Sequence, residues 1–177
     1  MMNRKKVVAI CGSTRKNSTN EMILRAIAAT YNDIFDVTIF NTIDALPHFN
    51  PDLENTKPQV VLEFLKMLED SDGVLFCTPE YVFSLPGALK NAIEWTIPTT
   101  VLLNKPVAII VASGLGEKAF ESLVLIMNTV GAKIGPQATL LIQGLRNKVD
   151  ADGMPVTEDL KSRMQQLVDS FRESIGS

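Results

Sequence analysis

Histidine and cysteine are scarce in this chain. His48 is the only histidine among 177 residues, and Cys11 and Cys77 are the only cysteines. A single imidazole argues against a histidine-dependent metal centre and a histidine-based catalytic triad. The two cysteines lie at or near the ends of apolar runs. We therefore expect small buried side chains in a reducing compartment, with neither a disulfide nor a metal site. We expect His48, in a proline-rich loop, to be exposed, and assign it no role.

Long hydrophobic runs and an excess of positive charge are also missing. No apolar run approaches the roughly 20 residues that span a bilayer, and the run at 7–10 is too short for the core of a signal peptide. A net charge of −3 and a pI near 5.2 leave no basic surface for nucleic acid or anionic lipid. We therefore expect a cytoplasmic protein with no nucleic-acid or membrane partner. Its length fits one domain, 1–177.

Apolar runs alternate with amphipathic patterns along the chain. The runs predict strands, and the patterns with a period of 3.6 residues predict helices. The expected strands are 7–10, 35–40, 73–77, 106–112 and 139–142, and the expected helices are 22–31, 59–70, 86–95, 119–130 and 156–175. Residues 41–58 predict an irregular loop with one short helical turn, and 119–130 is apolar nearly all round, which predicts a well-buried helix.

This alternation predicts an α/β fold. Five apolar strands separated by helices favour a flavodoxin-like three-layer sandwich around a five-stranded parallel sheet, with the strand order 2-1-3-4-5. Ligands bind such sheets outside the carboxyl ends of the strands, where the strand order reverses. The loops 12–20, 78–86 and 113–118 are expected to meet there.

The loop at 12–20 connects a buried strand to a helix, a geometry that presents free backbone N–H groups to an anion. It carries hydroxyl donors and a permanent cation, namely Ser13, Thr14, Arg15, Ser18 and Thr19. These features predict a phosphate site. A second interpretation stays open, because the sequence from Ser18 to Glu21 also fits a capping box that only closes the helix.

The motifs that would bind other phosphate ligands are absent. The chain has no G-x-G-x-x-G for a dinucleotide and no G-K-[ST] for a nucleoside triphosphate. The second loop holds Tyr81 between Pro79 and Pro86, and the third is rich in glycine, which lets backbone approach a flat ring. One phosphate at one end and a planar heterocycle between two loops describe flavin mononucleotide, FMN.

Two long motifs carry a family resemblance. The segments Gly12-Ser13-x-Arg15-x-x-Ser18-x-Asn20 and Thr78-Pro79-Glu80-Tyr81-x-x-Ser84-x-Pro86-Gly87-x-Leu89-Lys90-Asn91-x-Ile93-Glu94-Trp95 resemble the NADPH-dependent FMN reductase family. That family includes soluble quinone, azo-dye and chromate reductases, and the resemblance covers nearly the whole chain.

The resemblance implies a set of FMN-binding residues. Those expected around the phosphate are Ser13, Thr14, Arg15, Ser18, Thr19 and Asn20; those along the isoalloxazine ring are Pro79, Glu80, Tyr81, Val82 and Ser84; those of the third loop are Ser113 and Gly114. At Val82 the family commonly has asparagine. The exchange matters little if this position meets the flavin through its backbone N–H, and alters flavin binding if the amide side chain is needed.

The implied function is an FMN-dependent NAD(P)H oxidoreductase that passes hydride from NADPH or NADH through FMN to a quinone, azo compound or similar small-molecule acceptor. The cofactor carries the chemistry, so no side-chain acid or nucleophile is required. We expect Glu80 to order backbone rather than transfer protons, and Trp95 to lie in the core or a subunit interface. Related reductases imply a homodimer or homotetramer.

Other functions stay as alternatives. A flavodoxin-type electron carrier, or an FMN-dependent redox sensor acting on a protein partner, would use the same fold and cofactor. A phosphatase of the low-molecular-weight type needs cysteine and arginine six positions apart, whereas Arg15 follows Cys11 by four. A receiver domain needs acidic residues at the ends of the first and third strands, and neither end has them.

Overall fold

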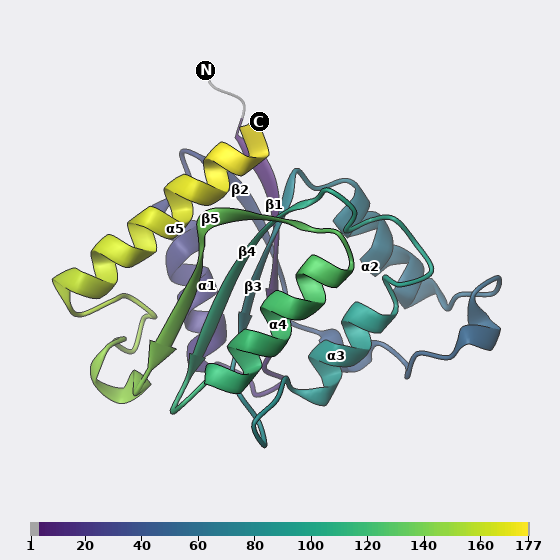
Figure 1. Ribbon diagram of the computed structural model, residues 1–177, viewed down its shortest axis with the longest axis horizontal. Helices are drawn as coiled ribbons and strands as arrows, with labels where there is room; N and C mark the ends of the chain where they lie inside the picture. Colours follow the sequence, from purple (N-terminus) through teal and green to yellow (C-terminus); the bar gives the residue numbers. More distant parts are fainter. Residues whose placement is uncertain (1–3, 177) are drawn as a thin grey trace.

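Five parallel strands form the centre of the protein. The computed structural model describes residues 4–176; Met1–Asn3 and Ser177, parts of the predicted domain 1–177, lie outside the described residues. The strands are β1 (Lys5–Cys11), β2 (Phe35–Phe40), β3 (Gly73–Thr78), β4 (Pro106–Ser113) and β5 (Lys133–Gln143), hydrogen-bonded in the order β2-β1-β3-β4-β5 (Figure 1). The predicted strand order is confirmed.

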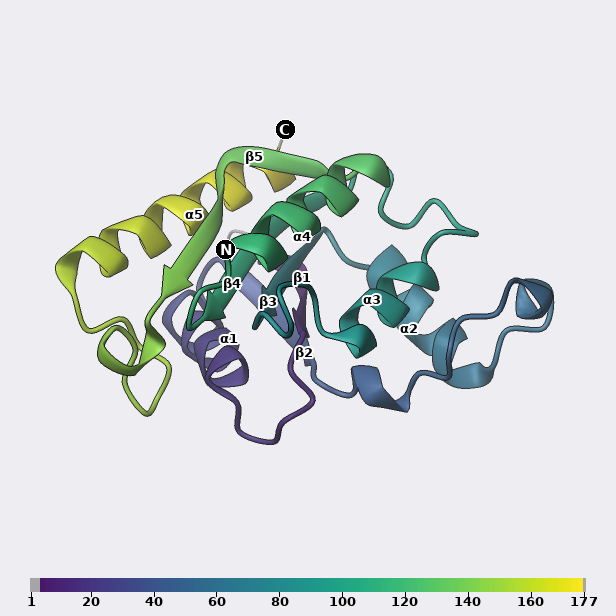
Figure 2. The same cartoon turned by 60° about the horizontal axis from the view of Figure 1, so that its bottom comes forward.

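Helices cover both faces of the sheet, as Figures 1 and 2 show. One face carries α1 (Thr19–Thr30) and α5 (Glu158–Gly176), and the other carries α2 (Gln59–Glu69), α3 (Gly87–Glu94) and α4 (Glu117–Thr129). Short 3-10 turns lie at Ile43–Ala45, Pro51–Leu53 and Leu145–Asn147. The three-layer flavodoxin-like sandwich is confirmed. The loop predicted over 41–58 contains two of these turns where one was expected.

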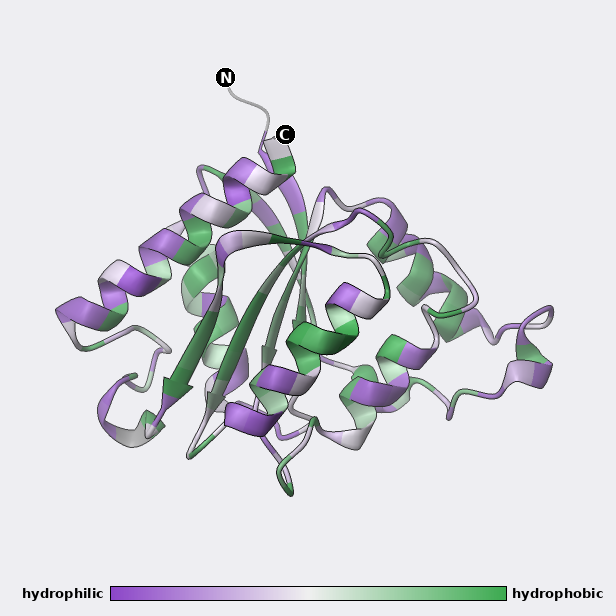
Figure 3. Ribbon diagram, viewed as in Figure 1, coloured by the Kyte–Doolittle hydropathy of each residue, from purple (hydrophilic) through white to green (hydrophobic). Residues whose placement is uncertain are grey.

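Alternation along β1 supplies both halves of the core. Val7, Ala9 and Cys11 pack against α1 and α5, whereas Val8 and Ile10 pack towards the opposite helices. Burial of each valine or isoleucine side chain among them contributes roughly 1.5–3 kcal/mol. Figure 3 shows the result, with β3 and β4 hydrophobic along most of their length and the helices hydrophobic along one side. No helix within residues 4–176 is long and apolar enough to cross a membrane.

The fifth strand is longer than its prediction. β5 begins at Lys133, whereas the sequence predicted 139–142, because Gly135 and Pro136 are typical strand breakers. The pairing of β4 with β5 is irregular between Val107 and Ile109, which lets this segment remain in the sheet. A side chain at Gly135 would collide with α5, since an added Cβ would lie 2.7 Å from the Ser170 hydroxyl.

The prediction that the fourth helix is well buried is wrong. In α4 only Ala119, Leu123 and Met127 are buried, and Leu125 is 67% exposed. Leu125 on the outer side of this helix therefore faces solvent, and Phe120, Val124 and Ile126 are only partly buried. A pattern that is apolar all round does not reveal which side meets the sheet.

Trp95 is a core residue. Its side chain is fully buried, its Nε1 atom donates to the Pro47 carbonyl at 2.8 Å, and Phe49 contacts it edge-on with ring centroids 5.2 Å apart. The core alternative is confirmed, and the subunit-interface alternative is wrong for this side chain. His48 is exposed, as predicted.

Candidate functional site

Loops after β1, β3 and β4 enclose a cavity at the carboxyl edge of the sheet, which is the lower edge in Figure 1. The cavity has a volume of about 210 Å³ and lies where the strand order reverses between β1 and β3. Its lining residues are Ser13, Arg15, Ser18, Thr19, Asn20, Pro79, Glu80, Tyr81, Ala112, Ser113, Gly114 and Leu145. The tertiary structure thus brings together loops that are separate in the sequence.

Most of the predicted site residues line this cavity. Thr14, Val82 and Ser84 do not. Thr14 lies on the other side of the first loop, whereas the side chains of Val82 and Ser84 are exposed on the second loop. The sequence analysis missed Ala112 and Leu145. Leu145 lies beside the cavity because the Gly144 N–H donates to the Ser113 carbonyl at 3.1 Å. The sequence signal for this residue was that the fifth strand also ends at the carboxyl edge of the sheet.

Gly12 lets the first loop lie close to β3. Its N–H donates to the Cys77 carbonyl at 2.8 Å, and an added Cβ would come within 2.2 Å of the Thr78 hydroxyl oxygen. Only glycine fits this contact. The next residue, Ser13, is buried, and its hydroxyl accepts from the Arg15 backbone N–H at 3.3 Å. The loop is therefore folded onto the end of the sheet before α1 begins.

Ser18 caps helix α1. Its hydroxyl oxygen accepts from the Glu21 backbone N–H at 3.2 Å, which satisfies one of the free donors of the first turn. Glu21 does not complete a capping box on Ser18. Its carboxylate accepts from the Arg25 guanidinium at 2.7 Å and from the Asn41 amide at 3.0 Å. The bond from Arg25 is the main reason why the pKa of Glu21 is lowered. The capping interpretation is confirmed for Ser18. Because Ser18 satisfies only one backbone donor, other N–H groups of the first turn of α1 can still bind an anion.

Asn20 points into the protein and links three elements. Its side chain is buried, its amide nitrogen donates to the Ala112 carbonyl on β4 at 3.3 Å, and its Oδ1 atom accepts from the Cys77 thiol on β3 at 3.3 Å. A residue predicted from the sequence to surround the phosphate thus also positions the first turn of α1 against the sheet.

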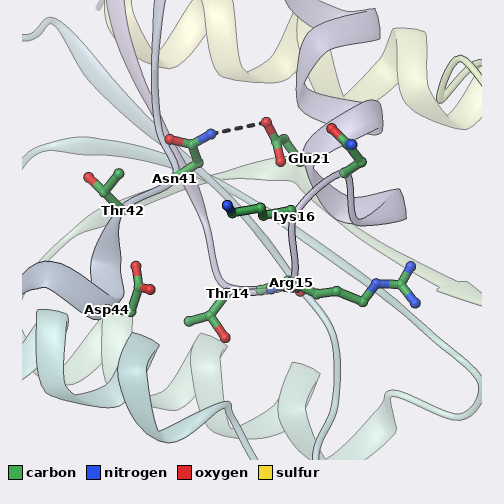
Figure 4. Close-up of a pocket in the computed structure, with 9 residues that line it drawn as sticks. Thr14, Arg15, Lys16, Glu21, Asn41, Thr42 and Asp44 are labelled. Carbon is green, nitrogen blue, oxygen red and sulfur yellow. Dashed lines mark hydrogen bonds between the residues drawn. The ribbon is translucent and has the colours of Figure 1, made fainter.

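Arg15 and Lys16 lie on opposite sides of the first loop. A second cavity, of about 350 Å³, lies on the β2 side and is lined by Ser13, Thr14, Arg15, Lys16, Asn17, Glu21, Asn41, Thr42 and Asp44. Lys16 points into this cavity, whereas Arg15, which also lines the cavity between the three loops, points away from it (Figure 4). The Arg15 guanidinium forms no ion pair with any residue within 4–176, so it is available to an anion.

Glu80 fastens the second loop to the third. Its carboxylate accepts from the backbone N–H groups of Gly116 at 3.2 Å, Lys118 at 2.8 Å and Ala119 at 3.0 Å. These bonds, above all the one from Ala119, lower the pKa of Glu80. A carboxylate at the N-terminus of α4 is also favoured by the helix dipole. The interpretation of Glu80 as a residue that orders backbone is confirmed.

The two thiols are poor nucleophiles. Cys11 and Cys77 are both fully buried, and burial raises the pKa of Cys11 and raises that of Cys77 well above its ordinary value. Each thiol is therefore protonated near neutral pH, whereas a cysteine nucleophile acts as the thiolate. The prediction of buried thiols is confirmed, and a cysteine-dependent phosphatase finds no support in this site.

These features define a class of protein: a flavodoxin-like α/β protein whose ligand site lies at the switch point of the sheet. The profile of the NADPH-dependent FMN reductases matches residues 5–145, and the chain belongs to this family.

The similarity to known proteins extends over almost the full length of this chain. The NAD(P)H:quinone oxidoreductase of Solanum tuberosum is 40% identical over 172 residues, which cover 92% of this chain and 89% of that protein. The NADPH azoreductase of Bacillus sp. is 26% identical over 175 residues, covering 95% of each. The solved structure of FerB, a flavoenzyme NAD(P)H:(acceptor) oxidoreductase from Paracoccus denitrificans, matches with a TM-score of 0.86 and 31% identity over 97% of both chains.

The residues present fit FMN. At one end, the turn before α1 offers backbone N–H groups, the buried Ser13 and the unpaired cation of Arg15 to a phosphate. At the other end, Pro79 and Tyr81 face the third loop across the cavity. There a Cβ added to Gly114 would meet no atom within 4 Å, which leaves bare backbone beside open space. Bare backbone at this position lets a flat ring approach the third loop.

Proposed function

We propose that this chain is an FMN-dependent NAD(P)H oxidoreductase that reduces a quinone, an azo compound or a similar small acceptor. The observation that carries the proposal is a cavity lined by phosphate-binding groups of the first loop together with Pro79, Tyr81 and Gly114 of the other two loops, in a chain of the NADPH-dependent FMN reductase family. For a quinone, NAD(P)H and one proton are consumed, and NAD(P)⁺ and the hydroquinone are formed. When bound, FMN supplies the chemistry that accepts hydride and delivers two electrons.

The protein residues would hold and orient the cofactor. We assign the phosphate to the first loop, with Ser13, Arg15, Ser18 and Thr19 as donors from the cavity side and Thr14, which lines the neighbouring cavity, as a donor through its backbone N–H. Asn20 positions this loop through its hydrogen bonds to Ala112 on β4 and Cys77 on β3. We assign the ring to the slot formed by Pro79, Glu80, Tyr81, Ser113 and Gly114, with the backbone of the turn at Val82 and Ser84 at its rim. No side chain has to donate or accept a proton during hydride transfer, which agrees with the use of the Glu80 carboxylate in backbone bonds.

We further propose that residues 1–177 form one cytoplasmic domain that assembles as a homodimer or homotetramer. Exposed apolar side chains, which an oligomer could bury, support the proposal of an assembly. Leu125 on α4 is 67% exposed, and Ile97 and Leu103, in the connection after α3, are 58% and 54% exposed. Light scattering of the purified protein measures the mass of the assembly, and a monomer at micromolar concentration would contradict this part.

A visible absorption spectrum tests the cofactor directly. We expect yellow protein, or apoprotein that binds added FMN and then oxidises NADPH or NADH when a quinone is present. Protein that stays colourless and does not respond to FMN in a titration would overturn the proposal. The same assay separates the enzyme from an electron carrier, which would oxidise little NAD(P)H directly; the comparisons give the carrier and the redox sensor no support.

A further inference from the structure

The tip of the second loop is a two-residue hairpin with an unusual sequence. Tyr81 and Ser84 exchange both of their backbone hydrogen bonds, at 3.0 Å each, so that Val82 and Phe83 occupy the two central positions. Both central residues have positive φ, 51° for Val82 and 55° for Phe83. Such turns favour Asn-Gly, because glycine and asparagine adopt this backbone conformation with little strain. A β-branched residue followed by an aromatic residue is strained there.

The same side chains are exposed to water. Val82 is 95% exposed, Phe83 69% and Tyr81 48%. None of these apolar surfaces is used in the core, so packing inside the described chain does not compensate for the strain. A turn made only to reverse the chain would be more stable with polar residues that accept positive φ. The strain and the exposure together point to a surface that is used in binding.

The turn adjoins the cavity between the three loops. Tyr81 lines that cavity, and the turn protrudes at the bottom of Figure 1, where residues 80–84 lie at the carboxyl edge of the sheet. Glu80, which directly precedes the turn, fixes the turn to the third loop by accepting a hydrogen bond from the Gly116 N–H. Leu115 comes directly before that N–H in the chain and is 60% exposed. The exposed apolar side chains of Tyr81, Val82 and Phe83 on the turn and of Leu115 on the third loop are called the apolar rim, and of these Tyr81 also lines the cavity.

We propose that this apolar rim docks the electron acceptor and decides which acceptors the enzyme prefers. The inference rests on the proposed function and deepens it, since it assigns a role to side chains that the cofactor does not need. The rim is continuous with the cavity through Tyr81, so a molecule seated on it lies next to the proposed ring site. The favoured occupant is a flat, uncharged and largely apolar molecule, whose burial against valine, phenylalanine and leucine is driven by the hydrophobic effect. A small hydrophilic acceptor gains nothing from this surface.

Asparagine substitutions separate acceptor docking from folding. Val82→Asn and Phe83→Asn remove the apolar side chains and relieve the positive-φ strain, so we expect the turn to persist and the melting temperature to stay or rise. In the double variant we expect kcat/KM for an uncharged naphthoquinone to fall about tenfold, the loss that corresponds to about 1.4 kcal/mol of contact. In the single variant Phe83→Asn, at a position not assigned to the cofactor, we expect kcat/KM for ferricyanide, and the affinity for FMN, to change less than twofold. Leu62→Asn, which removes a 47% exposed leucine on α2, is the matched control, and we expect kcat/KM for both acceptors to stay unchanged in it.

Each other result has a definite meaning. If kcat/KM for naphthoquinone is the same in the double variant and the wild type, the proposal that the apolar rim docks the acceptor is overturned, and the proposed function stays intact. A parallel loss for both acceptors in Phe83→Asn also overturns acceptor docking, because the turn would then act on the cofactor. A double variant whose assembly mass falls identifies the rim as a contact between copies and overturns acceptor docking. Wild-type protein that binds FMN but reduces neither acceptor overturns the proposed function itself.

Discussion

The thiol of Cys77 donates a hydrogen bond to the Oδ1 atom of Asn20 at 3.3 Å. The other end of the same amide donates to the Ala112 carbonyl at 3.3 Å, so one buried side chain links α1 to β3 and β4. The three elements whose ends surround the cavity are joined at this point. The position of the proposed phosphate loop therefore depends on hydrogen bonds made beneath it.

Replacement of Asn20 by alanine should destabilise the protein and weaken FMN binding. The Ala112 carbonyl and the Cys77 thiol would lose their partner in a buried environment, which costs about 1–3 kcal/mol. Urea denaturation of the apoprotein measures the free energy of unfolding, and titration with FMN measures affinity. Lys16→Ala, an exposed change in the same loop, is the control. An unchanged unfolding free energy in Asn20→Ala would refute the linking role.

Arg15 and Lys16 should differ in their contribution to FMN affinity. Arg15 lines the cavity between the three loops, whereas Lys16 points into the other cavity. We expect Arg15→Ala to raise the dissociation constant of FMN about tenfold, equivalent to about 1.4 kcal/mol. The loss should shrink at high salt, because exposed charges are screened.

The comparison variant for this prediction is Lys16→Ala, for which we expect less than a threefold change. Riboflavin, which lacks the phosphate, should bind Arg15→Ala and wild type equally. Equal losses of FMN affinity in the two alanine variants would mean that the loop acts through its net charge and not through the placement of Arg15.

Glu80→Gln should lower the melting temperature at neutral pH by a few degrees, because an amide caps the first turn of α4 less well than a carboxylate. Hydrogen bonds, first of all from the Ala119 N–H, lower the pKa of Glu80 below its ordinary value of 4.5 in the folded protein. The stabilisation by the carboxylate is therefore fully present above pH 4.5 and is lost as the pH falls through the lower folded value. Melting curves of both proteins should converge in acid; a gap that is constant from pH 7 to pH 3 would contradict this explanation.

Trp95→Phe should destabilise the protein without altering the proposed cofactor site. The change leaves the Pro47 carbonyl without its indole donor and leaves space beside Phe49, for which we expect a cost of about 2 kcal/mol. Circular dichroism is the suitable probe, since Trp95 is the only tryptophan. FMN affinity of the folded variant should match the wild type, and a large loss of affinity would place Trp95 in the site after all.

Local patterns determined most of the architecture and the location of the site. The period-2 alternation of residues 35–40, the apolar runs at 73–77 and 106–112, and the helical periods between them are written in neighbouring residues, and right-handed crossovers leave few topologies for such an order. The capping role of Ser18 and the loops around the cavity are local in the same sense.

The tertiary structure decided which way side chains point and what meets them. It turned Asn20 inward, set Arg15 and Lys16 on opposite sides of one loop, and brought Leu145 to the cavity. It gave Val82 a left-handed backbone and left Leu125 in solvent. These outcomes depend on contacts between residues far apart in the chain, such as Asn20 with Ala112, and no periodicity within a short segment encodes such a contact.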